Sequence, residues 1–400
     1  MKLDARGVHL TYCSNIHPGE TWPEVRGNLE RYVPGVRDRV APGQPFGIGL
    51  RLSALAARAL AVPAALEEFL DFMRRQNLYV FTLNGFPYGR FHGTRVKEDV
   101  YLPDWRDEER LRYSDELAEL LALLLPDDPE LEGSVSTVPG AFKPLVRDAA
   151  DVERIAEHML RHVARLVDIE RRTGRSIALA IEPEPHCYLE TIDETVRFFG
   201  DYLFSAAAVR RLGELAGLDK QTASAALHDH IGVCLDLCHA AVEFEDPVNC
   251  LKRLDDAGIR VAKLQISAGL RLRELSPAAL RALKQFDDAV YLHQVVESGP
   301  RGVTRFADLP QAFASLSGHA PGAEWRVHFH VPIFLDRLES FSATRDFIEQ
   351  VLGLHRSRPL SHHLEVETYT WDVLPPQYRV DALEDAIARE LIWVKQKLAV

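Results

Sequence analysis

Carboxylate side chains stand at or just past the ends of three apolar segments of the sequence. A carboxylate beside an apolar strand costs free energy unless it pairs with a cation or binds a metal ion. A single such residue could instead cap the helix that follows it, but here the pattern recurs. The recurrence favours one shared metal site. The carboxylates concerned are Glu182, Glu184, Asp236, Glu365 and Glu367.

Imidazole and amide side chains occupy related positions. His239, three residues after Asp236, suits contact with a substrate hydroxyl or carbonyl, although a histidine bonded to backbone at a helix start is an equal alternative. Gln265 lies where the next strand would present a ligand, or else it is a hydrogen-bonding barrel residue. His328 and His330, two apart on a strand-like segment, compete with Gln265 for that ligand position.

The donor set indicates a divalent cation whose identity stays open. Carboxylates suit Mg²⁺, Mn²⁺ or Co²⁺, and an added imidazole widens the choice to Zn²⁺ or Fe²⁺. Glu182, Glu367 and His239 are the expected catalytic residues. Of the two remaining carboxylates, Glu184 is a weaker candidate ligand, and Glu365 could orient a ligand histidine or act as the general base. The expected metal ligands are Glu182, Asp236, Gln265, His330 and Glu367.

A second group of polar and aromatic side chains lies just past other strand ends. In a barrel these loops face the active site, so these residues are candidate substrate contacts. Lys143 could polarise a carbonyl or bind a phosphate, and Trp371 could lie against a sugar ring or be ordinary core. The candidates are Tyr12, Asn84, Lys143, His186, His328 and Trp371.

Strand and helix patterns alternate along the chain, which predicts parallel strands joined by helical crossovers. We expect a (β/α)8 TIM barrel, an α/β fold, in a single domain over 1–400. Insertions are expected at about 203–230 and at 268–325, the latter between strands 7 and 8. A doubly wound sheet would usually show a glycine-rich turn after its first strand, and residues 15–19 do not match one. The expected barrel strands are 8–14, 46–52, 78–85, 134–140, 177–182, 232–236, 261–267 and 363–371.

Several further elements are expected outside the barrel strands. Segments 291–296 and 325–331 are strand-like. Helical patterns cover 151–173, 247–256, 306–316, 342–354 and 381–398.

Composition narrows the class of protein. The chain has 400 residues and a net charge of −12 without a long basic run, which makes a nucleic-acid groove unexpected. Its five cysteines, an odd number, indicate reduced thiols in a cytosolic protein. We expect neither a signal peptide nor a transmembrane segment, and therefore a cytoplasmic protein whose oligomeric state is open.

Longer strings of residues resemble a known family. Segments 10–20, 291–294, 328–332 and 364–375 resemble the EboE family, described as metabolite traffic proteins of secondary-metabolite export. The strand pattern is similar to the xylose isomerase-like barrel superfamily of sugar isomerases and epimerases. That resemblance implies a divalent metal held at the last four strands, here by Glu182, Asp236, Gln265 and Glu367. Gln265 departs from the histidine usual in sugar isomerases.

The resemblance and the residues together lead to three functional hypotheses. The first is a metal-dependent isomerase or epimerase acting on a sugar, a sugar phosphate or a similar polyhydroxylated small molecule. The second is a metabolite-binding carrier without turnover. The third is a metal-dependent hydrolase, which would call for two or three clustered metal ions.

Overall fold

A computed structural model gives the architecture of the chain. It describes residues 1–90, 92, 97–287, 290–316, 322–338, 340–371, 373–378 and 382–399. Residue 381, the expected start of the last helix, lies outside these ranges.

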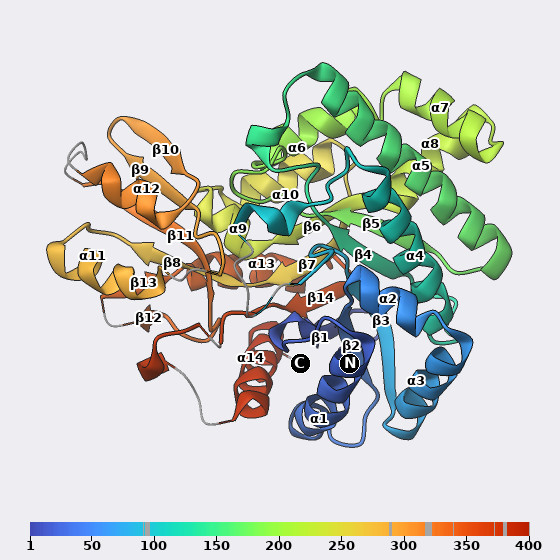
Figure 1. The fold of residues 1–400 in the computed structure, drawn as a ribbon, viewed down its shortest axis with the longest axis horizontal. Helices are drawn as coiled ribbons and strands as arrows, with labels where there is room; N and C mark the ends of the chain where they lie inside the picture. Colours follow the sequence, from blue (N-terminus) through green and yellow to red (C-terminus); the bar gives the residue numbers. More distant parts are fainter. Residues whose placement is uncertain are drawn as a thin grey trace.

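An eight-stranded parallel sheet forms the barrel, in the order β1-β14-β7-β6-β5-β4-β3-β2. A parallel bridge between Cys13 and Gly49 closes the ring between β1 and β2. The expected TIM barrel is therefore confirmed, and each expected strand matches an observed one (Figure 1). The barrel strands are β1 (His9–Tyr12), β2 (Phe46–Arg51), β3 (Leu78–Asn84), β4 (Gly133–Thr137), β5 (Ile177–Ile181), β6 (Ile231–Asp236), β7 (Val261–Ile266) and β14 (His363–Val366).

Helices surround the barrel between successive strands. In α5 (Ala149–Thr173), Ile155, Met159 and Val163 recur at helical spacing and are buried, and Gly174 ends the helix with φ +71°. The other covering helices are α1 (Trp22–Val40), α2 (Ala54–Leu60), α3 (Pro63–Arg75), α4 (Glu108–Leu124), α6 (Ile192–Phe198), α7 (Ala206–Ala216), α8 (Lys220–His230), α9 (Leu237–Val242), α10 (Pro247–Asp256), α13 (Arg345–Ser357) and α14 (Leu383–Leu398).

A six-stranded antiparallel sheet is inserted between β7 and β14, in the order β10-β9-β11-β8-β13-β12. An insertion is expected here at 268–325, but its sheet structure is not, and the sheet extends to Ala343. Only Ser267 separates β7 from β8, so the chain passes directly from the barrel into this sheet. The expected strand 291–296 starts too early, because β9 begins at Val295. The expected helix 306–316 is present as the shorter α12, which follows the end of β10 at Phe306, and the expected strand 325–331 is confirmed as β11. The elements are β8 (Ala268–Leu272), α11 (Pro277–Leu283), β9 (Val295–Gly299), β10 (Gly302–Phe306), α12 (Leu309–Ala314), β11 (Glu324–Val331), β12 (Arg337–Leu338) and β13 (Phe341–Ala343).

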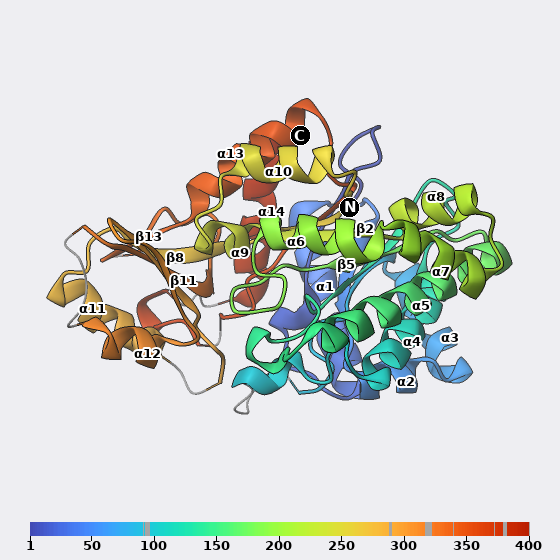
Figure 2. The ribbon, with the colours of Figure 1, turned by 90° about the horizontal axis from the view of Figure 1, so that it is seen from above.

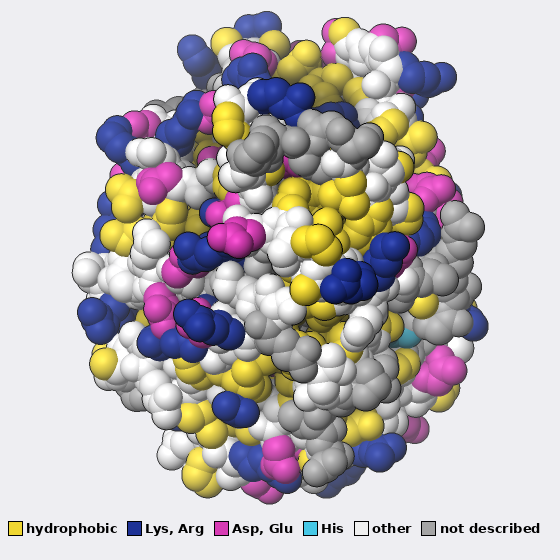
Figure 3. Space-filling model, turned by 90° about the vertical axis from the view of Figure 1, so that its left-hand side faces the viewer, with side chains coloured by type: hydrophobic (Ala, Val, Ile, Leu, Met, Phe, Trp, Pro, Cys, Tyr) yellow, Lys and Arg dark blue, Asp and Glu magenta, His cyan; other side chains and the backbone are white. Residues whose placement is uncertain are grey.

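The insertion stands at one side of the barrel, and Figure 2 shows it next to α9 and α13. The short helix α9 packs against both β8 and β11, so it joins the two sheets. On the outer face of the insertion, basic and acidic side chains are interspersed among apolar ones (Figure 3). Within the described residues, every helix is too short or too polar to cross a bilayer.

Candidate metal centre

Three carboxylates meet at the carboxyl end of the barrel. Glu182 follows β5, Asp236 ends β6 and Glu367 follows β14, and these strands lie close together in the sheet order. One oxygen of each carboxylate lies within 4.8 Å of the other two, and all three side chains are buried. The burial matters because it removes the water that would otherwise screen their repulsion.

A small cavity, with about 40 Å³ of room for water-sized molecules, adjoins these carboxylates. Residues from both the barrel and the insertion line it, so the insertion forms part of the wall. The lining residues are Asn15, Phe86, Pro87, Lys97, Val100, Tyr101, Glu182, Glu184, His239, Tyr291, Leu292, Gln294, His328, Glu367 and Tyr369.

Two asparagine side chains hold Glu367. The Nδ2 atoms of Asn15 and Asn84 donate to its Oε1 at 2.7 and 3.1 Å. Burial, with the nearby charges of Asp236 and Glu365, raises the pKa of Glu367 to about 8. The two donors orient the carboxylate, and its second oxygen, Oε2, lies 3.8 Å from His330 Nδ1.

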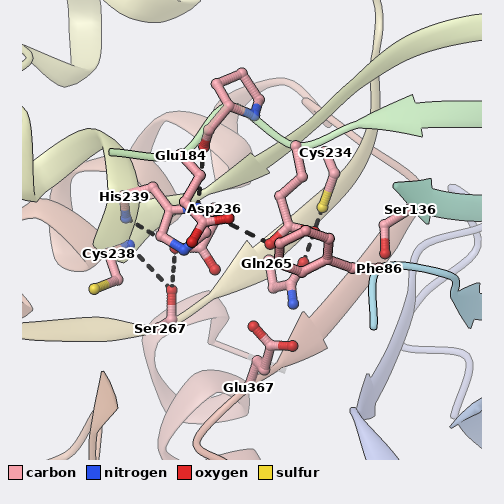
Figure 4. Close-up of polar contacts among 12 residues, drawn as sticks. Phe86, Ser136, Glu184, Cys234, Asp236, Cys238, His239, Gln265, Ser267 and Glu367 are labelled. Atoms are coloured by element: carbon pink, nitrogen blue, oxygen red, sulfur yellow. Dashed lines mark hydrogen bonds and ion pairs between the residues drawn. The ribbon is translucent and has the colours of Figure 1, made fainter. Parts of the chain in front are cut away.

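Asp236 and Glu182 each keep one oxygen without a hydrogen-bond partner among the described residues, Oδ2 and Oε2 respectively. Asp236 Oδ1 accepts from Ser267 Oγ at 2.7 Å and from the His239 backbone N–H at 2.9 Å (Figure 4). The helix-capping alternative is therefore realised as well, through that one oxygen. Burial, followed by the charges of Glu367 and Asp236, raises the pKa of Glu182 well above its ordinary value. A bound cation would give the unpartnered oxygens a partner and would offset the repulsion between the carboxylates.

Gln265 lies on β7 between these carboxylate positions. Its Oε1 accepts from Cys234 Sγ at 2.9 Å, while its buried Nε2 has no hydrogen-bond partner among the described residues. Figure 4 shows this Nε2 directed toward the side of the cavity from which Glu367 projects. The two ends of an amide are assigned from their hydrogen bonds. An amide turned over would therefore present Oε1, a metal-ligating oxygen, to the carboxylates.

Three histidines lie beside the carboxylates with their hydrogen positions set by carbonyl acceptors. His239 Nδ1 donates to Pro183 O at 3.0 Å, and His330 Nδ1 donates to Glu367 O at 2.8 Å. His328 Nδ1 donates to Gln294 Oε1 at 2.9 Å. Because a carbonyl oxygen only accepts, each Nδ1 carries the hydrogen and each neutral ring keeps a lone pair on Nε2. The backbone-bonded alternative for His239 is thus observed, next to the cavity.

Burial also lowers the basicity of two of these rings. Together with the neighbouring rings of His239 and His330, it holds the pKa of His328 well below its ordinary value. Burial lowers the pKa of His330 to about 4. Both rings are therefore neutral at physiological pH, the form that binds metals.

Most of the expected substrate-binding residues lie away from the lining of the cavity. Asn84 touches Glu367, whereas the Tyr12 hydroxyl bonds to His17 and the Lys143 ammonium pairs with Glu190 and Glu194. Among the described residues, Tyr12, Lys143, His186 and Trp371 do not line the cavity, and their roles stay predictions.

The Glu365 carboxylate lies inside the barrel and is paired with Lys263, so the expected role of orienting a ligand histidine is not observed.

Two residues around Glu184 gave little signal in the sequence. Tyr101 donates to Glu184 Oε1 at 2.7 Å, and Gln294 Nε2 donates to that tyrosine hydroxyl. Gln294 stood out only within the string 291–294, and no pattern singled out Tyr101.

Comparisons with known proteins concern the overall fold. No protein-family model and no curated protein matches the chain. A xylose isomerase-like TIM barrel protein from Mycobacterium smegmatis in complex with magnesium is 15% identical over 97% of this chain and 98% of its own, with a TM-score of 0.48. The probable 3-DHS dehydratase AsbF from Bacillus anthracis is 11% identical over 97% and 98%, at 0.46. The IOLI protein with a zinc atom is 14% identical over 98% of both chains, at 0.45. These likenesses do not test the resemblance to the EboE family.

Proposed function

We propose that this protein is a divalent-metal-dependent enzyme that moves a proton between neighbouring carbons of a small, polyhydroxylated, sugar-like substrate. The observation that supports the proposal is the group of Glu182, Asp236 and Glu367. These buried carboxylates have ligand oxygens within 4.8 Å of one another, beside a cavity. Three buried carboxylates repel one another strongly unless a cation binds between them.

The residues fit a metal ion. Glu182 Oε2 and Asp236 Oδ2 are buried without partners among the described residues, and Gln265 offers a further oxygen once its amide is turned. An oxygen-rich set of this kind suits Mg²⁺, Mn²⁺ or Co²⁺. When bound, the ion would polarise the carbonyl and hydroxyl oxygens of the substrate.

Glu182 and Glu367 are the groups that would accept and return the proton. A general base works best when its pKa is near the working pH. Burial raises the pKa of Glu367 to about 8 and raises that of Glu182 well above its ordinary value. Asn15 and Asn84 fix the orientation of Glu367. Tyr101, among the aromatic residues that line the cavity, presents a flat wall to a sugar ring.

The resemblance to the EboE family extends the proposal to a cellular role. We propose that the enzyme acts in the cytoplasm, in a pathway that exports a secondary metabolite. All five cysteines are free and buried, which fits a reducing compartment.

A direct test starts with protein purified without chelator. We expect at least one equivalent of a divalent metal in elemental analysis. In ²H₂O with a panel of ketoses, aldoses and their phosphates, we expect deuterium at the carbon next to the carbonyl, seen by NMR. Glu182→Gln and Glu367→Gln should abolish the exchange. Glu390→Gln, which changes a buried carboxylate outside the cavity lining, should keep it.

The same experiment separates the proposal from its alternative. Hydrolysis of a phosphate ester or glycoside without exchange would replace it with a metal-dependent hydrolase, a candidate that the nearby histidines favour. A metal-free protein that binds a sugar without exchange would contradict both.

A further inference from the structure

The Nε2 atoms of His239 and His328 lie 3.0 Å apart. Their Nδ1 hydrogens are already donated, to Pro183 O and to Gln294 Oε1. The Gln294 amide is itself fixed, because its Nε2 donates to the Tyr101 hydroxyl and to a backbone carbonyl. Two neutral rings in these tautomers point lone pairs at each other, which is repulsive. Something positive must lie between them or beside them.

The separation of the two nitrogens matches two ligands of one metal ion. Imidazole nitrogens bind Zn²⁺ at about 2.1 Å. Two of them are then about 3.0 Å apart at the 90° angle of an octahedral ion, and about 3.4 Å apart at the tetrahedral angle that zinc usually adopts. A proton shared between the two rings is the competing explanation, and the number of ions bound by the wild-type protein distinguishes the two.

Glu184 is a candidate third ligand. One oxygen of Glu184 lies within 4.8 Å of ligand nitrogens of His239 and His328. Its Oε1 accepts from the Tyr101 hydroxyl, whereas Oε2 is buried without a partner among the described residues. All three side chains line the cavity, so an ion held by them would keep open positions toward a substrate.

We propose that Glu184, His239 and His328 bind a second divalent transition-metal ion, next to the carboxylate site. The set of two histidines and one carboxylate favours Zn²⁺, Fe²⁺ or Co²⁺ over Mg²⁺. Tyr101 and Gln294 orient its ligands through hydrogen bonds. The proposal is independent of the isomerase chemistry, and it gives His239 a ligand role in place of the expected substrate contact.

The two ion positions adjoin each other through His239. Its nitrogens lie 3.9 Å from Glu182 Oε1 and 3.9 Å from Asp236 Oδ1. A substrate in the cavity would therefore meet both ions. His328 comes from β11, so this second position exists only because the inserted sheet folds back over the barrel mouth.

The test uses the full-length protein, stripped of metal and reloaded with Zn²⁺. We expect the wild type to bind two ions per chain, and X-ray absorption of the zinc-loaded protein to show imidazole ligands. His328→Gln should bind one ion and lose the imidazole signal. Glu367→Gln should also bind one ion but keep that signal. His230→Gln changes a buried histidine at the opposite end of β6, and should still bind two.

Two results would overturn the second site. One is a single bound ion in the wild type, and the other is zinc bound without any imidazole ligand. The absorption spectrum of the wild type decides the point even if a variant fails to fold. Absence of deuterium exchange would refute the proposed function and leave this site intact.

Discussion

A buried ion pair lies beneath the candidate metal centre. Lys263 Nζ and Glu365 Oε2 are 2.5 Å apart inside the barrel, and both side chains are fully buried. Lys263 also lowers the pKa of Glu182 and of Glu367, although burial and carboxylate repulsion outweigh it. The lysine thus supplies a fixed positive charge below a cluster of acids, and Glu365 balances it.

Removing one member of this pair should be costly. Lys263→Met leaves Glu365 buried without its counter-charge, so we expect a loss of about 3–5 kcal/mol in the free energy of unfolding, measured in urea. The double variant Lys263→Met with Glu365→Gln removes both charges and should recover much of the loss. A double variant as unstable as the sum of the single ones would contradict this account.

At the scale of elements, β2 approaches β1 and β14 closely at one glycine. A Cβ atom on Gly49 would stand 1.9 Å from Glu365 Oε1 and 2.7 Å from Tyr12 O. Because one of these atoms is backbone, the strands themselves would have to shift. The missing side chain at Gly49 is what lets Glu365 lie inside the closed barrel.

Gly49→Ala should therefore destabilise the barrel, by about 1–3 kcal/mol or more. Gly27→Ala is the matched control, since a Cβ there meets nothing within 4 Å and the residue lies inside α1. That control should be neutral, or stabilising by up to about 1 kcal/mol. Thermal unfolding of both variants measures the difference, and equal midpoints would refute the close-approach argument.

Glu390, on helix α14, connects the segment that follows β11 with the segment that follows β14. Its Oε1 accepts from Ile333 N at 3.1 Å and from Thr368 Oγ1 at 2.7 Å. Burial raises its pKa from 4.5 to about 8. The folded state then binds a proton that the unfolded state releases. Stability from this group is greatest below pH 4.5 and is lost as pH rises to 8.

The Glu390→Gln variant lacks this titration. Relative to it, the wild type should lose stability on the order of 4 kcal/mol between pH 4.5 and 8. Urea unfolding of both proteins at pH 5 and pH 8.5 measures the change. Stability profiles that stay parallel across this range would show that the carboxyl group titrates normally.

The barrel strands could be predicted from the sequence because each is a short apolar run between helical patterns. Of the inserted sheet, only the strand-like segments 291–296 and 325–331 could be predicted. Strand β8 is separated from β7 by Ser267 alone, and the sequence pattern predicts no further strand after 267. In an antiparallel sheet, pairing partners are set by contacts far apart in the chain, as between β8 and β11, and local pattern does not reveal them.

The candidate site also has a part that the sequence could predict and a part that it could not. Glu182, Asp236 and Glu367 could be singled out because a charged residue at the end of an apolar strand is unusual. The approach of His328 to His239 could not, because it depends on how β11 crosses the barrel mouth. Likewise, nothing in the sequence distinguished Glu184 as the partner of Tyr101.

At the scale of the whole molecule, metal binding and stability should be linked. The carboxylates of the candidate site come from the ends of β5, β6 and β14, far apart in the chain, so the unfolded chain has no such site. An ion that binds only the folded state stabilises it by about 2.7 kcal/mol at 100 times its Kd. For a chain of this length that corresponds to a rise of a few degrees in Tm.

Asp236→Asn isolates the charge, because an asparagine oxygen can still accept from Ser267 and from the His239 N–H. We expect Mn²⁺ to raise the Tm of the chelator-treated wild type and to have little effect on Asp236→Asn. Asp219→Asn replaces an exposed carboxylate that caps α8, a position where asparagine caps equally well, and should respond like the wild type. An equal Mn²⁺ response in Asp236→Asn, measured by differential scanning calorimetry, would place the ion elsewhere. The carboxylates would then need some other explanation for their burial.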